Sequence, residues 1–495
     1  MNVPEWATGA PTVIAVFVVL SGIAVRVIAL GVIPGGRKPS VGMAWLLAIL
    51  LSPVLGLAGF LLFGRSEVGR RRQRRQERVD AIVAERSREL DIAPSHQLSG
   101  QPMLGGVVAL NDNLGAFPLL AGNVVRLHES YDESMAAMAE AVRGATSSVH
   151  VEFYIAAWDD VTAPVLEACA KAAARGVTVR LLFDHLATRG TSGYADFRRR
   201  LTESDILWRE MLPLHPLRGQ FRRPDLRNHR KMLVVDGAIG FMGSQNLIEP
   251  GYGSKANHRA GRAYVDLMTS VTGPAVAALD AVFAGDWYQE TGERLEVEVH
   301  DALPMPGAQW VTDVSLQVVP SGPGVRGERN LRMFTSLIHA ATHRVSITSP
   351  YFVPDESLLY AVTTAALRGV DVELFVSEVA DQFMVGHAQA SYYTALLEAG
   401  VRIRLYPGPF ILHSKHFTVD DDVTVIGSSN MDLRSFALNY EVVALMVGTQ
   451  VVDRMRAVED QYRAVSRLLT LAEWQERPAL ARYLDNVMRL TAGLQ

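Results

Sequence analysis

Residues 229–246 read HRKMLVVDGAIGFMGSQN, and residues 413–430 read HSKHFTVDDDVTVIGSSN. Both stretches follow one pattern, H-x-K-x4-D-x6-G-S-x-N, so six specified positions recur in the same register. The chain has only five lysines, and Lys231 and Lys415 are two of them. Since arginine carries most of the positive charge elsewhere, these two places indicate a need for a compact point charge rather than a planar fork.

The segments around each motif also repeat, in the order strand, helix, strand, helix, strand. In the first half we expect them at 124–127, 134–142, 149–155, a helix ending at Gly176, and 177–183; in the second half at 316–319, 330–341, 345–352, a helix ending at Gly369, and 370–376. Alternating strands and helices predict an α/β sheet in each half. Two similar sheets pack most simply about a pseudo-twofold axis, which would bring the two motifs together.

Composition predicts four parts of the chain. They are an apolar hairpin (1–66), a basic juxtamembrane helix and linker (67–120), a first α/β domain (121–300), and a second α/β domain with C-terminal helices (301–495). We expect the juxtamembrane helix over 79–90, and a linker over 97–115 because that stretch is rich in Gly, Ser, Pro and Asn. Thr470 and Glu473 predict a capping box in the C-terminal tail.

The start of the chain is unusually apolar. Residues 6–25 carry no charge, and residues 41–63 form a second uncharged run of 23 residues. Each run is long enough to cross a bilayer as a helix. A cleavable signal peptide is the alternative, but no Lys or Arg precedes Arg26 and the second run follows directly. We therefore expect two transmembrane helices.

Loop charge predicts the orientation of this hairpin. Seven arginines lie between positions 65 and 78, whereas the connection between the runs holds only Arg37 and Lys38. The excess of positive charge after the second run predicts that the rest of the chain is cytoplasmic. The arginine run itself is typical of a stop-transfer signal or of a site for anionic lipid headgroups.

Overall charge and cysteine content exclude some classes of function. The formal net charge is -4, so a general nucleic-acid-binding surface is not expected. Cys169 is the single cysteine, which allows neither an internal disulfide nor a thiolate-rich metal site. The sequence indicates no oligomeric state.

The residue types of the motif suit a phosphate group. Residues i and i+2 of a strand share a face, so His229 can lie beside Lys231, and His413 beside Lys415. If the two copies meet, one histidine can attack phosphorus while the other protonates the departing alcohol. The lysines would balance charge on the phosphoryl oxygens. Further hydrogen bonds to the phosphate are expected from Asn246, Asn430, Ser244 and Ser428.

A metal site is the competing interpretation of clustered His and Asp residues. It fits poorly, because a lysine two residues from each histidine repels a cation, and no pair of carboxylates lies at ligand spacing. The sequence therefore predicts chemistry without a metal or another cofactor.

The duplicated pattern resembles the phospholipase D superfamily, and its flanks narrow the likeness. The runs RNHRK (227–231), NMDLRS (430–435) and SGP (321–323), together with Asn439 and the N-terminal hairpin, are similar to bacterial cardiolipin synthases. The resemblance implies two phospholipase D-like domains. It also implies transfer of a phosphatidyl group from one phosphatidylglycerol to the glycerol hydroxyl of another at the bacterial plasma membrane, giving cardiolipin and glycerol.

The resemblance also implies roles for individual residues. His229 would be the nucleophile and His413 the acid and base, although the residues alone do not rank them. Asp236 and Asp420 belong to the catalytic motif but would act mainly as buried structural partners. Glu441 and Asp266 would orient the histidines. The first copy has Gly-Ser where relatives often have Gly-Gly, which leaves the role of Ser244 open.

Other functions are compatible with parts of this pattern. In a phospholipase D hydrolase the same site would use water in place of the second alcohol, and the motif does not decide between them. Anchoring at a lipid surface favours a lipid acceptor. A nuclease is disfavoured, because the net charge is near neutral and two membrane spans do not suit a polyanionic substrate. A non-enzymatic membrane scaffold with an inactive site is also disfavoured, because both copies keep every motif residue.

Two segments beside the motifs have alternative interpretations. The arginines at 218, 222, 223, 227 and 230, interleaved with Leu214, Leu217 and Phe221, form either a solvated basic loop or an interfacial segment that holds anionic headgroups. Residues 409–412 line an acyl path or form a buried strand.

Overall fold

A computed structural model describes residues 5–35, 39–64, 75, 78, 102–215, 223–297, 300, 309–325 and 327–491. The chain divides into two compact units, residues 1–68 and residues 69–495. The expected helix over 79–90 and most of the arginine run lie outside the described residues.

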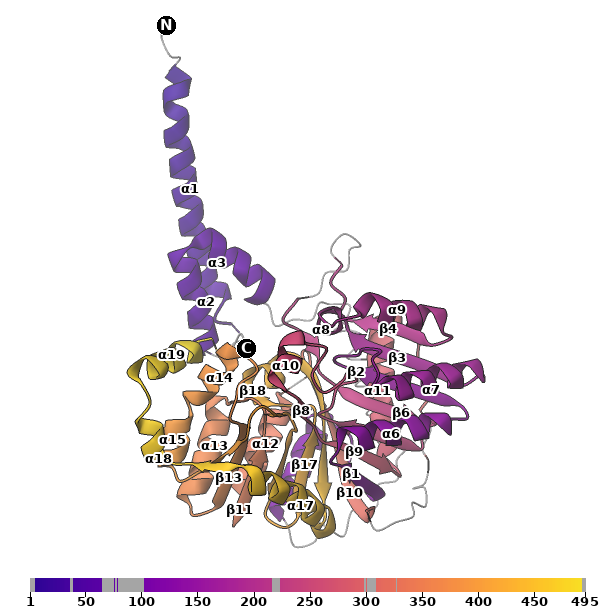
Figure 1. Ribbon diagram of the computed structural model, residues 1–495. Helices are drawn as coiled ribbons and strands as arrows, with labels where there is room; N and C mark the ends of the chain where they lie inside the picture. The colour runs from indigo at the N-terminus through magenta and orange to yellow at the C-terminus, as the bar shows by residue number, and fades with distance from the viewer. Residues whose placement is uncertain are drawn as a thin grey trace. The chain divides into compact units, whose positions relative to one another are not determined.

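One sheet of sixteen strands runs through the described part of the second unit (Figure 1). Its centre is the antiparallel pair of β1 (Leu120–His128) and β10 (Val311–Ser321). Outward from β1 follow β9 (Met268–Thr272), β7 (Ile239–Gly243), β6 (Lys231–Val235), β2 (Ser148–Phe153), β3 (Thr178–Asp184) and β4 (Leu207–Met211). Outward from β10 follow β19 (Asn439–Val447), β17 (Val423–Gly427), β16 (His416–Val419), β11 (Arg344–Thr348), β13 (Asp371–Ser377), β14 (Arg402–Tyr406) and β20 (Arg467–Leu469). The sixteenth strand, β5 (Arg227–Asn228), pairs with β19 outside this order.

The two halves repeat the same strand order about the β1–β10 pair. In the first half β2, β3 and β4 are parallel to one another, and the motif strand β6 is antiparallel to β2. In the second half β11, β13 and β14 are parallel to one another, and the motif strand β16 is antiparallel to β11. This order confirms the expected α/β duplication and fits a pseudo-twofold axis between β1 and β10. The two halves form one continuous sheet, because β1 of the first half pairs directly with β10 of the second half.

Helices cover both faces of each half. In the first half α6 (Tyr131–Arg143), α7 (Ala163–Ala174) and α9 (Tyr194–Glu203) cover one face, and α11 (Ala275–Thr291) covers the other. Successive side chains of β6 show how this is encoded, since Leu233 and Val235 pack with the first group and Met232 and Val234 with the second. The second half uses α12 (Arg329–Ala340) and α13 (Glu356–Leu367) on one face and α17 (Thr449–Val465) on the other.

Several local expectations are confirmed. Gly176 and Gly369 follow helices α7 and α13 with φ of 93° and 91°, a backbone conformation that glycine adopts without strain. Thr470 accepts a hydrogen bond from the backbone N–H of Glu473 at 3.2 Å, as the capping box predicts.

The expected linker over 97–115 is wrong for most of its length. Residues Pro102–Asn113 form helix α5, which packs against α12 and buries Leu104, Val107 and Val108. Asn111 is buried on the same face and donates a hydrogen bond to Gln317 at 2.8 Å. Apolar spacing of three and four residues outweighs the helix-breaking composition here.

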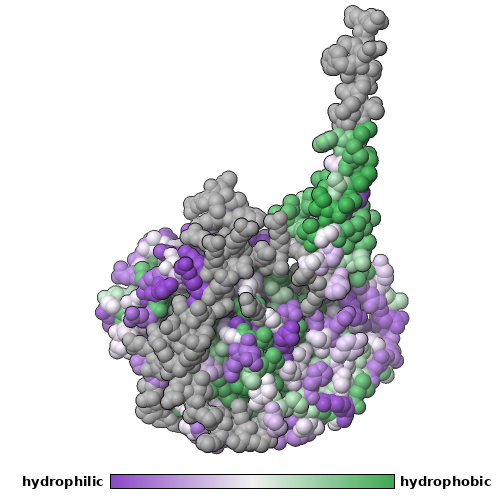
Figure 2. Space-filling view, turned by 180° about the vertical axis from the view of Figure 1, so that it is seen from behind, coloured by the Kyte–Doolittle hydropathy of each residue, from purple (hydrophilic) through white to green (hydrophobic). Residues whose placement is uncertain are grey.

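The N-terminal unit contains α1 (Glu5–Val32), α2 (Pro39–Leu51), α3 (Pro53–Gly59) and the π-helical turn η1 (Phe60–Gly64). The second apolar run is therefore broken, because Pro53 lacks an N–H and its ring clashes with the preceding helical turn. Arg26 donates to the carbonyl of Leu50 at 3.1 Å beside this break. Figure 2 shows the apolar surface of this unit. Across the described ranges, no helix meets both the length and the hydropathy required to span a membrane.

Candidate active site

Each motif histidine is held by the backbone of the opposite half. The short strand β5 (Arg227–Asn228) pairs in parallel with β19, and the N–H of His229 donates to the carbonyl of Tyr440 at 2.8 Å. In the same way β15 (Ile411–Leu412) pairs with β8 (Tyr264–Val265), and the N–H of His413 donates to the carbonyl of Val265 at 2.7 Å. The site therefore needs both halves.

The imidazoles are oriented crosswise by carboxylates. Nδ1 of His229 lies 3.0 and 3.1 Å from the two carboxylate oxygens of Glu441, which belongs to the second half. Nδ1 of His413 lies 2.7 Å from Oδ1 of Asp266, which belongs to the first half. A proton on Nδ1 that is shared with a carboxylate leaves Nε2 of each ring free for chemistry.

The serines of both motifs bind these carboxylates. Ser244 donates to Asp266 at 2.6 Å, and Ser428 donates to Glu441 at 2.5 Å. The expectation that these hydroxyls donate to the phosphate is therefore not supported by their contacts. The equivalence of the two pairs also gives Ser244 a role, which is to hold the carboxylate that orients His413.

The motif lysines are buried beside the histidines. Lys231 Nζ donates to the carbonyl of His229 at 2.5 Å, and Lys415 Nζ donates to that of His413 at 2.6 Å. Burial lowers the pKa of Lys231 well below its usual value and lowers the pKa of Lys415 to about 8. Each ammonium keeps further N–H donors for an anion.

Burial and charge also set the protonation of the imidazoles. Burial lowers the pKa of His229 well below its usual value, and Lys231, Lys415 and His413 lower it further. Lys415 and His413 belong to the second motif, so charges of the second motif act on the histidine of the first. Burial also lowers the pKa of His413, but Asp266 partly opposes this shift.

The two orienting carboxylates differ. Burial raises the pKa of Glu441 to about 7, although Lys231 and Ser428 oppose this shift. Burial also acts to raise the pKa of Asp266, but His413, Lys415 and Ser244 outweigh it, and the net pKa is lowered. Asp266 is therefore the more firmly ionised of the two.

The motif aspartates lie away from the imidazoles and hold the ends of the motif strands. Asp236 has φ of 52° and accepts hydrogen bonds from the backbone and hydroxyls of Thr146 and Ser147 and from the N–H of Ser148, all at 2.8 or 2.9 Å. Asp420 has φ of 49° and accepts equivalent bonds from residues 342–344. Both carboxylates are half-buried, and these contacts fit the structural role expected of them within the catalytic motif.

The motif asparagines have unequal surroundings. Asn246 Nδ2 donates to the hydroxyl of Tyr252 at 2.8 Å, and its Oδ1 accepts from the N–H of Ile155 at 3.2 Å. Asn430 Oδ1 is buried and has no hydrogen-bond partner among the residues that the structure describes. The amide of Asn246 is thus committed to the protein, while the carbonyl of Asn430 remains available to a hydroxyl donor.

A family model described as "Cardiolipin synthase, PLD-like domain" matches residues 138–287 and 334–462, which include both motifs. The chain belongs to this family. Cardiolipin synthase A of Pectobacterium carotovorum is 31% identical over 90% of this chain and 91% of its own length. Cardiolipin synthase of Geobacillus kaustophilus is 31% identical over 97% of this chain and 94% of its own length.

A solved structure supports the fold. The crystal structure of a phosphatidylserine synthase of Haemophilus influenzae is 16% identical and has a TM-score of 0.56, covering 75% of this chain and 95% of that one. At this identity the likeness concerns the fold alone. It agrees with the α/β architecture of the second unit.

Two arginines expected in a solvated loop or at a lipid surface are buried instead. Arg227 pairs with Asp184 at 3.0 Å, and Arg230 pairs with Asp286 behind the site. Arg223 pairs with Asp225, whereas the arginines at 218 and 222 lie outside the described residues. Buried charges require such partners, which explains the acidic residues nearby. The segment 411–412 is likewise a buried strand.

Sequence reasoning missed the aromatic residues that line the imidazoles. The ring of Tyr154 meets His229 edge-on at 4.8 Å between centroids, and that of Tyr264 meets His413 edge-on at 5.3 Å. Tyr264 and Tyr351 both donate to Asp381, at 2.8 and 2.6 Å. Tyr154 and Tyr351 follow the equivalent strands β2 and β11, so aligning the two halves could have found them.

Proposed function

We propose that the protein is a phosphatidyltransferase that converts two molecules of phosphatidylglycerol to cardiolipin and glycerol. The observation that carries this proposal is the crossed pairing of His229 with Glu441 and of His413 with Asp266. It supports one composite site with two free Nε2 atoms and two buried ammonium groups. The names of the similar proteins from Pectobacterium and Geobacillus support the substrate class.

The first step forms a covalent intermediate. Nε2 of His229 attacks the phosphorus of one phosphatidylglycerol and forms a P–N bond. The bond between phosphorus and the headgroup glycerol oxygen breaks, and that oxygen takes the proton from Nε2 of His413. Glycerol departs and a phosphatidyl-histidine remains.

The second step regenerates the enzyme. A glycerol hydroxyl of another phosphatidylglycerol gives its proton to Nε2 of His413, and its oxygen attacks phosphorus. The P–N bond breaks, so His229 returns to its neutral form and cardiolipin is released. The proton on His413 is ready for the next cycle.

The unequal carboxylates support these roles. A firmly ionised Asp266 stabilises an imidazolium at His413, which a general acid requires. Glu441, with a pKa of about 7, provides less negative charge to His229, whose own pKa is lowered by burial and two lysines. A neutral imidazole is the form that attacks phosphorus.

Charge balance at phosphorus comes from the chain itself. The ammonium groups of Lys231 and Lys415 face the same site and offset the charge on the phosphoryl oxygens as bonds rearrange. No step of this reaction requires a metal ion. The amide of Asn430 is placed to add a hydrogen bond to the substrate.

We propose further that residues 1–66 attach the enzyme to the bacterial plasma membrane as a hairpin of two spans, with the second unit on the cytoplasmic side. The outward apolar side chains of α1 to α3 support attachment, since Phe17, Leu51 and Val54 are 72%, 85% and 79% exposed. The charge asymmetry of the loops supports the orientation.

The test is a product assay with the purified full chain. In phosphatidylglycerol vesicles we expect cardiolipin and glycerol to form in equal amounts, because each transfer releases one glycerol. His229→Ala and His413→Ala should abolish turnover, whereas the exposed His339→Ala should not. Phosphatidic acid as the main product would overturn the transfer and assign a phospholipase D hydrolase, and full activity of either motif variant would overturn the composite site.

A further inference from the structure

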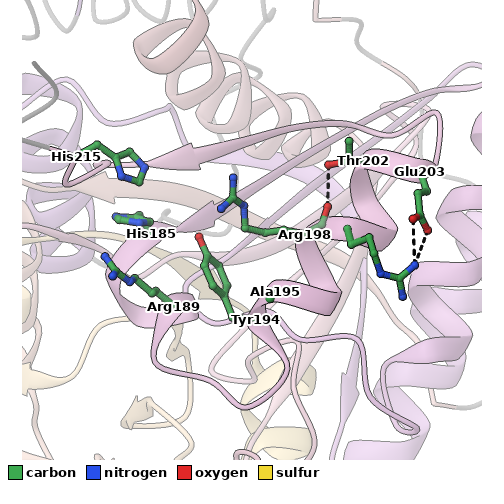
Figure 3. Close-up of a pocket in the computed structure, with 9 residues that line it drawn as sticks. His185, Arg189, Tyr194, Ala195, Arg198, Thr202, Glu203 and His215 are labelled. Atoms are coloured by element: carbon green, nitrogen blue, oxygen red, sulfur yellow. Dashed lines mark hydrogen bonds and ion pairs between the residues drawn. The ribbon is translucent and has the colours of Figure 1, made fainter. Parts of the chain in front are cut away.

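A second polar pocket lies in the first half, apart from the two motifs. It has a volume of about 690 Å³ and lies between the short helix α8 (His185–Arg189), α9 and the end of β4 (Figure 3). Its lining residues are His185, Arg189, Tyr194, Ala195, Arg198, Arg199, Thr202, Glu203 and His215. None of them belongs to either motif, so the proposed reaction leaves this pocket without a role.

The buried histidine of this pocket presents an N–H donor. His185 is only 1% exposed, and its Nδ1 accepts a hydrogen bond from the backbone N–H of Leu214 at 3.1 Å. A backbone N–H can only donate, so the neutral ring carries its proton on Nε2. That Nε2–H has no protein acceptor among the described residues and belongs to the lining of the pocket.

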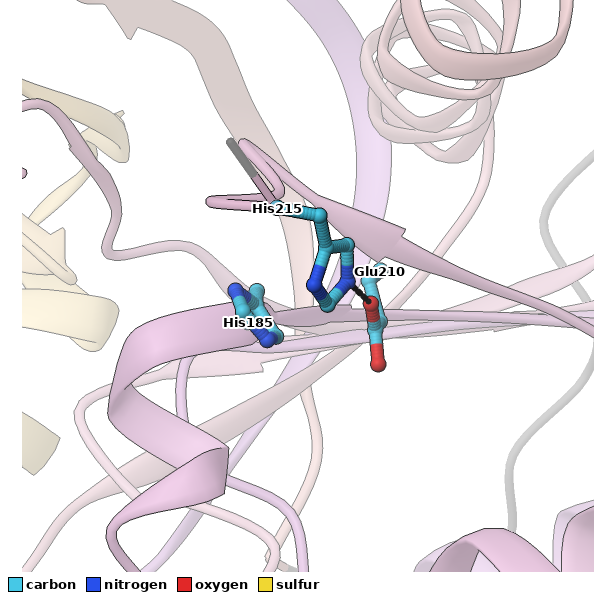
Figure 4. A group of neighbouring side chains, drawn as sticks. All are labelled: His185, Glu210 and His215. Carbon is cyan, nitrogen blue, oxygen red and sulfur yellow. Dashed lines mark hydrogen bonds and ion pairs between the residues drawn. The ribbon is translucent and has the colours of Figure 1, made fainter. Parts of the chain in front are cut away.

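Glu210 does not line the pocket but contacts three of the side chains that do. One of its oxygens accepts from the hydroxyl of Tyr194 at 2.6 Å, and the other lies 2.9 Å from Nε2 of His215 (Figure 4). Arg198 Nε lies 3.5 Å from the first oxygen. The carboxylate therefore orients three lining side chains rather than facing the pocket as a free charge.

The remaining charge of the pocket is positive. Arg199 is neutralised by Asp196 and by Glu203, which it contacts at 2.8 and 3.0 Å. Arg189 is exposed and has neither a hydrogen bond nor an ion pair within the described residues. Within the described part of the chain, the one ion pair of Arg198 is the long contact with Glu210, and its guanidinium lies over Tyr194 and Trp208 at 5.6 and 5.4 Å.

A metal ion is the alternative occupant. His185, Glu210 and His215 bring one ligand atom each within 4.8 Å of one another, which suits zinc by residue type. However, the free nitrogen of His185 bears a proton because its other nitrogen already accepts, so it offers no lone pair. A guanidinium also lies beside Glu210, where it would repel a cation.

We propose that this pocket binds a phosphate group through Arg189, Arg198 and the Nε2–H of His185. Guanidinium groups and a neutral N–H donor match phosphate oxygens, and the positive charge of Arg189, which pairs with no described carboxylate, matches its negative charge. The group can come from an anionic phospholipid headgroup or from a soluble phosphate. The lipid source rests on the proposed function; the binding itself does not.

The pocket is joined to the catalytic centre by adjacent residues. Asp184, immediately before His185, accepts hydrogen bonds from the side chain of Arg227 and the backbone N–H of Asn228, both at 3.0 Å. Asn228 immediately precedes His229. A phosphate bound to His185 would thus contact the residue next to Asp184, and Asp184 holds the backbone that leads into the first motif.

The test compares two exposed arginines of the same half. Arg189→Gln and Arg209→Gln remove equal charge, but Arg209 does not line the pocket. Calorimetric titration of the full chain with inorganic phosphate should show binding about tenfold weaker or lost in Arg189→Gln, and unchanged in Arg209→Gln. Both variants keep the catalytic centre intact, so any phosphate that binds there affects both titrations equally. Thermal melting checks that both variants fold.

Parallel titrations separate the sources and the alternative. Weaker binding of Arg189→Gln to phosphatidylcholine vesicles that contain phosphatidylglycerol would assign the lipid headgroup, and an effect on inorganic phosphate alone would assign a soluble phosphate. Equal binding of both variants in both titrations would overturn the proposal. Stoichiometric zinc binding that His215→Ala abolishes, without a phosphate effect of Arg189→Gln, would also overturn it. None of these measurements depends on turnover, so failure here is distinguishable from failure of the proposed reaction.

Discussion

Glu441 in the second half accepts the Nδ1 proton of His229 in the first half, at 3.0 Å. Its counterpart Asp266 makes the reciprocal contact with His413 at 2.7 Å. Neither histidine is oriented by its own half. Separating the halves would therefore remove the orienting carboxylate of both imidazoles at once, which makes the duplication necessary for function.

The crossed carboxylates predict unequal effects of two conservative variants. Asp266→Asn should lower turnover of phosphatidylglycerol by about 10- to 100-fold, because His413 loses the charge that stabilises its protonated form. A phosphatidyl ester of p-nitrophenol needs no proton for departure, so Asp266→Asn should form the intermediate from it at close to the normal rate. Glu441→Gln should be slow with both substrates, since it misplaces the nucleophile. Rapid-mixing kinetics of nitrophenolate release measures this.

The exposed Glu378→Gln, which removes a carboxylate that pairs with Arg467 rather than with a motif residue, provides the control. Equal slowing of Asp266→Asn with both leaving groups would contradict the assignment of His413 as the acid. In that case the roles of the two histidines would have to be exchanged.

The pH dependence of turnover should be narrow. Lys415 is charged below its pKa of about 8, so its ammonium is lost as pH rises through that value and turnover should fall. Glu441 is ionised above its pKa of about 7, so protonation as pH falls below that value should remove the acceptor of His229. We expect a bell-shaped profile of kcat/KM between these limits, measured in vesicles of constant composition. Constant activity to pH 10 would contradict the burial of Lys415.

Ionisation of Glu441, which turnover requires, should lower the stability of the folded protein. The folded pKa of Glu441 is raised, so its contribution to the free energy of unfolding is largest below the unfolded pKa near 4.5 and is lost as pH rises through about 7. Glu441→Gln should therefore stabilise the protein at pH 8, by about 1 to 3 kcal/mol, while it impairs turnover. Thermal melting at pH 8 and pH 5 would measure the difference.

The sequence predicted the parts of the site that a local pattern carries. The duplicated motif predicted two facing half-sites, and the repeated order of strands and helices predicted the α/β fold. Helix α5 was missed although Leu104, Val107, Val108 and Asn111 have helical spacing, because glycine and proline dominated the interpretation of that stretch. Periodicity was the better signal there.

Contacts between distant strands could not be predicted from spacing. Asp266 meets His413 only because β8 pairs with β15, and Glu441 meets His229 only because β5 pairs with β19. The resemblance suggested the orienting roles but not the exchange between halves. Burial of Arg227 and Arg230 was missed for the same reason, since Asp184 and Asp286 come from remote elements.

The structural role of Asp236 predicts a loss of stability rather than a loss of chemistry. Asp236→Ala leaves the donors of residues 146–148 without their acceptor, and the half-exposed position limits the cost to about 1 to 3 kcal/mol. The carboxyl pKa is lowered against burial by these hydrogen bonds, so this stability is present above pH 3.8 and is lost as pH falls. At low temperature the folded variant should retain more turnover than His229→Ala. Melting and turnover per folded molecule measure this, with the exposed Asp205→Ala as the control; a stable but inactive Asp236→Ala would contradict it.

The motif glycines allow two backbones to approach closely, and Gly427→Ala should show this. A Cβ at Gly427 would lie 2.3 Å from the carbonyl oxygen of Val442 and 2.7 Å from Cα of Val443, and backbone atoms in a sheet centre cannot move aside. Strands β17 and β19 would separate, and Ser428 would lose its contact with Glu441. We expect destabilisation of about 1 to 3 kcal/mol and reduced turnover.

Gly105→Ala is the matched control, because its Cβ would meet nothing within 4 Å in helix α5 and should stabilise the protein by about 0.5 to 1 kcal/mol. Thermal melting and hydrogen exchange of β17 measure both effects, and a Gly427→Ala variant as stable as the unmodified protein would show that the close approach of these strands is not required.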